Sequence, residues 1–261
     1  MIRLDDILGF YPPSLNEKVV FRKYILKEYI QLMILEYLSS TPYIQKVAFI
    51  GGTSLRLIKG IDRFSEDLDF DSKNFSSEDF LVMTDAIVKY LYKNGWKVAV
   101  TDKENSRLTA FRRNLIFPEL LYNFGLSGHK EERFLIKIEC QDQQVNYPPE
   151  MVNIKACGFF FPIAAPSEKV LCAMKIAAML NRRKGRDFYD VMFLLSRTMP
   201  DFEFLRIKTG ISSLEDLIAA VNDTLSAVDL KSKMRDFEHL LFNRGNSARI
   251  LAMAELMKSL Q

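Results

Sequence analysis

Two aspartates, Asp67 and Asp69, stand two positions apart in the segment SEDLDF. The acids alternate with apolar residues, which is the period of a half-buried β-strand, so both carboxylates are expected on one face of that strand. Two like charges this close repel each other unless a cation lies between them. Mg²⁺ binds carboxylate oxygens together with substrate phosphates, and Mn²⁺ suits the same oxygen ligands, so this pair is typical of a divalent metal site.

A phosphate-binding turn is predicted upstream of this strand. The apolar, β-prone segment KVAFI is followed by GGTSLRLI, in which the glycines come at the break between a strand and a helix. Gly51 and Gly52 allow close backbone approach and positive φ, while Thr53 and Ser54 place hydroxyls at a helix start that favours anions. Either motif alone is common, and a D-x-D strand is more often an exposed face. Their occurrence in this order predicts a nucleoside triphosphate (NTP) beside a metal.

A third acid is expected on a neighbouring strand. In RFLIKIEC, alternation places Lys137 and Glu139 on one face and the apolar residues on the other. One interpretation is an exposed strand face that carries a neutralising pair. The other is functional: Glu139 completes the metal site or helps to deprotonate the attacking hydroxyl, and Lys137 touches phosphate.

The segment Ala48–Phe70 resembles the signature of the DNA polymerase β-like nucleotidyltransferase superfamily: an apolar residue, Gly-Gly, a spacer, and Asp-apolar-Asp-apolar. Together with KIE, a Glu-x(6)-Lys helix from Glu168 to Lys175, and KGRDFYD, it is similar to the AbiEii/AbiGii toxin-type nucleotidyltransferases. The resemblance covers roughly residues 45 to 197. These families are the toxin halves of abortive-infection and toxin–antitoxin pairs.

This resemblance implies roles for individual residues of the chain. Gly52 and Ser54 would contact phosphate, and Asp67 and Asp69 would bind Mg²⁺. The resemblance also implies that Lys175 holds the triphosphate, that Asp187 is an active-site acid, and that Arg186 and Asp190 support that acid or the helix junction. Ser65 lies near the metal strand and would hydrogen-bond phosphate, although an ordinary polar residue at the strand entry is the alternative.

The implied activity is Mg²⁺-dependent transfer of a nucleoside monophosphate (NMP) from an NTP to an acceptor hydroxyl, with the 3′ end of tRNA as the acceptor and a cognate antitoxin protein as a partner. RNA would lie along two basic clusters, Arg112 with Arg113 and the group Arg182, Arg183, Lys184 and Arg186. From charge alone, both clusters are equally consistent with solvated surface.

Two other functions remain open at this point. The same site could transfer a nucleotide to a protein or small molecule, or could phosphorylate rather than nucleotidylate its target. Alternatively, the fold could be retained as a non-catalytic binding module. Label on the α-phosphate of the NTP is transferred only by nucleotidylation, and label on the γ-phosphate only by kinase chemistry.

These side chains must be positioned by an α+β fold, which we expect to be a nucleotidyltransferase-like mixed sheet flanked by helices and followed by a helical C-terminal domain. The predicted domains are residues 1–160 and 161–261. A long helix is expected over 15–39 and a turn-rich crossover over 142–166. The other expected helices are 76–92, 167–181, 186–197, 212–228, 230–242 and 246–260, and the other strands are 96–102, 108–117 and 133–141.

Composition excludes several classes of protein. Hydrophobic residues make up 48% of the chain and charged residues 26%, which are ordinary globular values. The three cysteines have no C-x-x-C spacing, so neither a zinc site nor a disulfide framework is indicated. No apolar run is long enough for a membrane span and no signal peptide is recognised, so a cytoplasmic location is expected.

Overall fold

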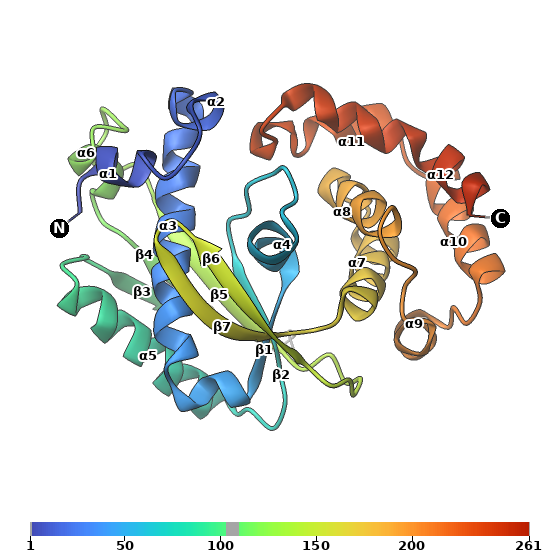
Figure 1. The fold of residues 1–261 in the computed structure, drawn as a ribbon, viewed down its shortest axis with the longest axis horizontal. Coiled ribbons are helices and arrows are strands. Elements are labelled where there is room, and N and C mark those ends of the chain that lie inside the picture. The colour runs from blue at the N-terminus through green and yellow to red at the C-terminus, as the bar shows by residue number, and fades with distance from the viewer. Residues whose placement is uncertain (1, 103–109, 261) are drawn as a thin grey trace. The chain divides into compact units, whose positions relative to one another are not determined.

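The computed structural model describes residues 2–102 and 110–260, and the chain divides into two compact units (Figure 1). The first unit comprises Met1–Lys59, Phe64–Gln144 and Pro149–Ala165. The second comprises Gly60–Arg63, Val145–Pro148 and Pro166–Gln261. Each unit therefore includes segments that are distant in sequence, and the short segment Gly60–Arg63 belongs to the second unit although both of its neighbours belong to the first.

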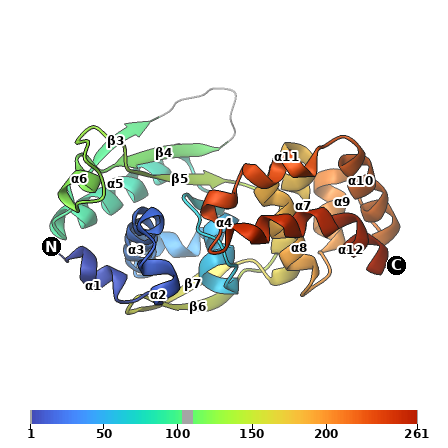
Figure 2. The ribbon, with the colours of Figure 1, turned by 90° about the horizontal axis from the view of Figure 1, so that it is seen from above.

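The first unit is built on a five-stranded mixed sheet, as the sequence predicts. Its strand order is β1 (Val47–Ile50), β2 (Leu68–Ser72), β5 (Leu135–Gln141), β4 (Phe111–Ile116) and β3 (Ala99–Asp102). Strands β2 and β5 run parallel, and the other neighbouring pairs are antiparallel. Figure 2 shows β3, β4 and β5 side by side. The predicted strand 108–117 begins at Phe111, and its positions 108 and 109 lie outside the described residues.

The register of the sheet aligns charged residues from three strands. Asp69 on β2 is the partner of Glu139 on β5, and Glu139 is in turn the partner of Arg112 on β4. On β1, Ile50 is the partner of Asp69, so the Gly-Gly turn begins one residue beyond that pair. Because side chains alternate along a strand, the other face of β5 is apolar and buried.

Two long helices accompany this sheet. Helix α3 (Val19–Ser39) is buried on nearly every side, which is typical of a helix that is apolar all round. Helix α5 (Ser77–Lys93) begins with a capping box between Ser76 and Asp79. The shorter elements are α1 (Leu4–Leu8), α2 (Pro13–Asn16), the 3₁₀ turn η1 (Pro42–Gln45), α4 (Gly51–Ser54), the π-helical turn η2 (Leu55–Lys59) and α6 (Leu120–Asn123).

A β-hairpin replaces the predicted turn-rich crossover over 142–166. Strands β6 (Glu150–Ala156) and β7 (Phe159–Ala165) pair along their full length. Cys157 and Gly158 form the two-residue turn with φ values of 50° and 82°, as a type I′ hairpin turn requires. Proline is tolerated at Pro162 because each strand of a two-stranded sheet has a free edge. The prolines therefore do not prevent strand formation here, and the prediction of a turn-rich crossover was wrong over 150–165.

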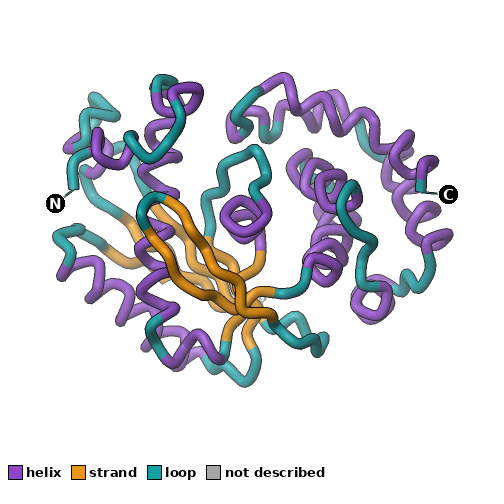
Figure 3. The backbone as a smooth tube through the Cα atoms, viewed as in Figure 1, coloured by secondary structure: helices purple, strands orange, loops and turns teal. Residues whose placement is uncertain are grey.

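The second unit is helical, as predicted (Figure 3). Its elements are α7 (Glu168–Arg182), α8 (Gly185–Leu195), α9 (Phe202–Thr209), α10 (Leu214–Ser226), α11 (Leu230–Arg235), η3 (Glu238–Leu240), η4 (Arg244–Ala252) and α12 (Met253–Ser259). The predicted helix 230–242 was too long, since α11 buries no residue that would stabilise an extension. Much of the predicted helix 246–260 is the 3₁₀ helix η4. In the part of the chain that the structure describes, no helix has the length and apolar character needed to cross a membrane.

Candidate active site

The Gly-Gly turn connects β1 to α4 and brings the backbone against Asp69. Gly51 has a φ of 82°, in the left-handed region that favours glycine. A Cβ atom at this position would lie 2.2 Å from Oδ2 of Asp69, far inside van der Waals contact. Glycine is therefore required here for two independent reasons, its backbone conformation and the space that it leaves for a carboxylate.

The two hydroxyl residues after the glycines have different environments. Thr53 is buried, and its Oγ1 donates a hydrogen bond to the backbone carbonyl of Asp67. Ser54 is 1% exposed, and its Oγ has no hydrogen-bond partner among the described residues. A buried hydroxyl without a partner is unfavourable, so Ser54 has unused capacity for a ligand. The hydroxyl of Thr53 therefore holds the turn against the chain before β2, and contact of Thr53 with nucleotide stays a prediction.

The π-helical turn η2 is anchored by a buried network that sequence reasoning missed. Arg56 donates to the carboxylate of Glu28 on α3 through Nε at 2.9 Å and Nη2 at 3.1 Å. The hydroxyl of Tyr11 donates to the same carboxylate at 2.9 Å, and burial, reinforced by this carboxylate, raises the pKa of Tyr11. This network fixes the helical segment that follows the Gly-Gly turn. Single π-turns are frequent at functional sites.

Lys137 lies between two of the predicted acids. Its Nζ is 3.0 Å from Oδ2 of Asp67 and 3.4 Å from Oε2 of Glu139. Partial burial lowers the pKa of Lys137, but the carboxylates of Asp67, Glu139 and Asp69 outweigh it and raise that pKa above its ordinary value. Lys137 is therefore a fully charged ammonium at neutral pH, and it lies directly against the acidic face.

Glu139 is held by a second cation. Nε of Arg112 lies 2.7 Å from Oε2 of Glu139, and Nη2 donates to Oε1 at 3.1 Å. Only the Nη2 contact has the geometry of a hydrogen bond, but the guanidinium lies against both carboxylate oxygens of Glu139. This pairing directs the guanidinium of Arg112 to the acidic face of the sheet, and its contact with RNA stays a prediction.

The donor chemistry of this face fits a divalent metal through its two aspartates. Asp67 and Asp69 supply carboxylate oxygens, the ligands that Mg²⁺ prefers, and Gly51 leaves space for the second of them. Glu139 fits less well because Arg112 binds both of its oxygens. Within residues 2–102 and 110–260, no three or more His, Cys, Asp or Glu side chains are grouped as a metal site would require. We therefore keep only the two aspartates as proposed ligands.

In the second unit, Asp190 joins two cations. Its carboxylate accepts hydrogen bonds from Nε and Nη2 of Arg63, both at 2.7 Å, and from Nζ of Lys175 at 2.8 Å. Burial acts to raise the pKa of Asp190, but the two cations outweigh it and lower that pKa to about 2. One carboxylate between two cations leaves a formal charge of +1 in this buried cluster. Nothing in the sequence around Arg63 indicates that it pairs with Asp190, which follows 127 residues later.

Asp187 is buried at the start of α8. Its Oδ1 accepts from Nη2 of Arg182 at 2.7 Å, and its Oδ2 accepts from the backbone N–H of Lys184 at 3.4 Å. Both contacts are typical of a carboxylate that caps a helix. Asp187 therefore has a structural role at the start of α8, and its role as an active-site acid stays a prediction.

The remaining predicted residues lie in varied surroundings. Ser65 is half-buried before β2, and its carbonyl accepts from Gln31 at 3.3 Å. Arg113 is buried, and its Nη1 donates to Thr84 at 2.8 Å and to Asp85 at 2.6 Å, which leaves little of its side chain open to the predicted RNA contact. In the second cluster, Arg182, Arg183 and Lys184 are exposed and Arg186 is half-buried.

Comparisons with known proteins identify the family and the fold. A family model described as "Nucleotidyl transferase AbiEii toxin, Type IV TA system" matches residues 34–255. No curated protein matches the sequence.

Solved structures show the same fold. The nucleotidyltransferase toxin MenT4 of Mycobacterium tuberculosis is similar over 100% of this chain and 91% of its own, with 20% identity and a TM-score of 0.68. JHP933 of Helicobacter pylori is similar over 91% of this chain and 92% of its own, with 18% identity and a TM-score of 0.55. The family match spans most of the chain and includes every motif described above, so the chain belongs to the AbiEii nucleotidyltransferase toxins of type IV toxin–antitoxin systems.

Proposed function

We propose that this nucleotidyltransferase moves an NMP group from a metal-bound NTP to the 3′ hydroxyl of an RNA, with tRNA as the acceptor. The observation that carries the proposal is the unpartnered buried hydroxyl of Ser54, three residues after the turn at which Gly51 makes room for Asp69. A phosphate oxygen would satisfy this hydroxyl. The neighbouring aspartates would hold the metal that accompanies the phosphates.

In this proposal the first unit binds and orients the triphosphate. Ser54 donates its hydroxyl to a phosphate oxygen, and Gly51 and Gly52 let the phosphate approach the backbone. Lys137 contributes an ammonium that is already charged at neutral pH. Thr53 keeps the turn and the first aspartate in register through its bond to the carbonyl of Asp67.

The reaction is an in-line displacement at the α-phosphorus. The acceptor oxygen forms the new P–O bond, the bond to the β-phosphate bridging oxygen breaks, pyrophosphate leaves, and the acceptor proton passes to a base or to water. Asp67 and Asp69 would hold Mg²⁺ or Mn²⁺, which would neutralise charge that develops on the phosphates. Glu139 serves mainly to orient Arg112 and Lys137 at the edge of this site.

Residues of the second unit complete the proposal. The family resemblance assigns Lys175 to the triphosphate and Asp187 to the active-site acids, and we retain both roles. Asp190 holds the ammonium group of Lys175 in one position through its hydrogen bond at 2.8 Å. Family membership further supports an antitoxin as the partner of the system. NTPs and tRNA as the substrates, and the cytoplasm as the location, remain part of the proposal.

The test is an incubation of the protein with total RNA, Mg²⁺ and each of four α-³²P-labelled NTPs, followed by a denaturing gel. Label is expected on a tRNA-sized band with one or two of the NTPs. Asp67→Asn should abolish it. Asp223→Asn, which removes one exposed carboxylate from α10, is the matched control and should label RNA like the wild type.

Other outcomes select the alternatives. Label on protein or on a small molecule, with none on RNA, would redirect the proposal to those acceptors. Transfer only from γ-³²P-labelled NTP would identify a kinase. Absence of transfer to any acceptor, together with an unchanged biological effect in Asp67→Asn, would favour a binding module.

A further inference from the structure

Helix α11 presents positive charge to solvent and contributes nothing to the core. Its six residues, LKSKMR, include Lys231, Lys233 and Arg235 and no acid, and none of them is buried. A helix this short has little stability of its own in water. Its place in the fold must therefore come from its contacts with neighbouring elements.

One of these contacts is with Gly185, the first residue of α8. A Cβ atom at Gly185 would lie 1.9 Å from the backbone carbonyl oxygen of Lys233 and 2.8 Å from Cδ1 of Phe237. The N–H of Gly185 also donates to Asp236 at 3.5 Å. Only glycine permits this approach, which places α11 beside the turn between α7 and α8 (Figures 1 and 2).

That turn carries the basic cluster recognised in the sequence. Residues 182–184 are exposed, and Arg183 adopts the left-handed conformation with a φ of 54° that ends α7. The turn and α11 together form what we call the basic surface, which consists of Arg182, Arg183, Lys184, Arg186, Lys231, Lys233 and Arg235.

The acids near the basic surface do not neutralise it. Asp187 is buried against Arg182, Asp229 caps α11 by accepting from the N–H of Lys231, and Asp236 lies 3.8 Å from Lys233. Glu238, in the 3₁₀ helix η3 that contacts α11, is a fourth carboxylate, so the seven cations leave a formal charge of +3. Local clusters of this kind, rather than the net charge of +3 of the whole chain, determine affinity for polyanions.

We infer that the basic surface binds the phosphate backbone of the acceptor RNA, with α11 as its second half. This inference rests on the proposed function, in which the acceptor is RNA. Arginine pairs with phosphate through two parallel hydrogen bonds, and lysine binds it as a point charge. Such contacts position a nucleic acid without reading its sequence.

The inference also gives a role to residues that carry no recognisable motif. The other predicted cluster offers less to RNA, because Arg113 is buried and Arg112 is paired with Glu139. The C-terminal region contributes instead, through α11, cations that lie 45 or more positions beyond the turn in the sequence.

The test measures binding of fluorescently labelled total tRNA by anisotropy across a range of KCl concentrations. Each phosphate contact adds about 0.7 to 0.9 to the negative slope of log K against log salt concentration. The triple variant K231Q/K233Q/R235Q should therefore reduce the slope by about 2 to 3. Its affinity at low salt should fall by at least tenfold.

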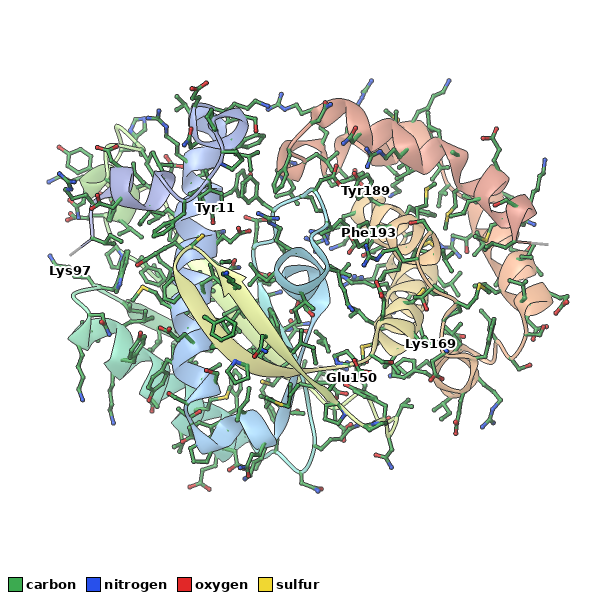
Figure 4. All side chains as sticks on the ribbon, viewed as in Figure 1. Tyr11, Lys97, Glu150, Lys169, Tyr189 and Phe193 are labelled. Atoms are coloured by element: carbon green, nitrogen blue, oxygen red, sulfur yellow. The ribbon has the colours of Figure 1, made fainter. Side chains whose placement is uncertain are left out.

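A matched control removes the same charge from the opposite end of α7. Lys169, Arg206 and Lys208 are exposed basic residues, and the N–H of Asp201, which caps α9, donates to the carbonyl of Lys169 at 3.0 Å. Lys169, which is labelled in Figure 4, lies near the start of α7. It is 13 residues before Arg182, about 20 Å along the helix at 1.5 Å per residue. The variant K169Q/R206Q/K208Q should retain the wild-type slope. Circular dichroism and thermal melting check that both variants fold.

The outcomes separate this inference from the proposed function. A wild-type slope in K231Q/K233Q/R235Q, with label still transferred to RNA, overturns the inference alone. The triple variant could lose salt dependence while the wild type transfers no nucleotide to RNA. This result would support the basic surface as an RNA-binding site and would overturn RNA as the acceptor. If the triple variant loses as much affinity for poly-glutamate as for tRNA, the basic surface binds polyanions in general, as would suit an acidic protein. That result would overturn the assignment to RNA.

Discussion

Gly51 and Asp69 lie so close that a single methyl group at the glycine would displace the carboxylate: its Cβ would lie 2.2 Å from Oδ2. We predict that Gly51→Ala reduces nucleotidyl transfer by at least tenfold. Part of any effect comes from the backbone, since alanine in the left-handed region costs about 1–2 kcal/mol. Transfer rates and urea unfolding measured on the same protein separate the two contributions.

Gly60 provides the matched control for this substitution. Its φ is 75°, close to that of Gly51, but a Cβ atom there would have no neighbour within 4 Å. Gly60→Ala should lose similar stability and keep its activity. Equal activity in the two alanine variants would show that contact with Asp69 is unimportant for transfer.

The hydroxyls of Ser54 and Thr53 should respond to removal in opposite ways. Ser54→Ala deletes a buried hydroxyl that has no partner among the described residues, so stability should be unchanged or slightly higher while NTP binding weakens. Thr53→Val deletes a hydrogen bond to the carbonyl of Asp67 and should cost about 1 kcal/mol. Calorimetric titration with NTP and thermal unfolding of both variants test this contrast. A stability loss in Ser54→Ala with intact NTP binding would contradict it.

Lys137 should contribute to NTP affinity through its charge. Lys137→Met removes the ammonium that lies 3.0 Å from Asp67 and leaves the acidic face less neutralised, so phosphate should be repelled. We expect the KM for NTP to rise about tenfold, which corresponds to about 1.4 kcal/mol. Lys155→Met, which removes an exposed lysine of β6, should leave the KM unchanged. Matching KM values in the two variants would exclude this role.

The buried pair of Arg63 and Asp190 predicts a pH-dependent contribution to stability. Asp190→Asn leaves two buried cations without their carboxylate and should cost about 3–5 kcal/mol at neutral pH. The pKa of Asp190 is lowered from 3.8 to about 2, so its stabilising effect is complete above about pH 5 and is lost as pH falls through about 2.

The advantage of the wild type over Asp190→Asn should therefore shrink by about 2 kcal/mol between pH 5 and pH 2. Urea unfolding at several pH values measures this difference, and Asp223→Asn serves as the exposed control. A difference that stays constant over this range would mean that Asp190 is not held ionised by its neighbours.

Local patterns accounted for much of the first unit. Alternation along β2 and β5 placed Asp69 and Glu139 on strands, and the family motif implied a mixed sheet. The glycine at Gly51 was predicted to allow positive φ, and it does so. Each of these inferences depends on interactions within a few residues, which a sequence displays directly.

Pairings between residues that are far apart in the sequence could not be predicted from it. Nothing near Arg112 indicates that its partner is Glu139, because that pairing depends on the register between β4 and β5. Arg113 likewise is buried against α5, where its guanidinium donates hydrogen bonds to Thr84 and Asp85. The hairpin turn at Cys157 and Gly158 lacks the Asn-Gly or Asp-Gly pair that is typical of a hairpin, and the prolines of the segment favour turns over strands.

The interleaving of the two units also constrains how the protein is made. Arg63 must be buried against a residue that follows it by 127 positions. At about 5–20 residues per second, a ribosome needs roughly 6–25 s to add these residues. During this time Asp190 is not available to neutralise Arg63. The second unit therefore cannot close until Asp190 has been synthesised and released from the ribosomal tunnel, so a prematurely terminated chain would lack the buried cluster around Lys175.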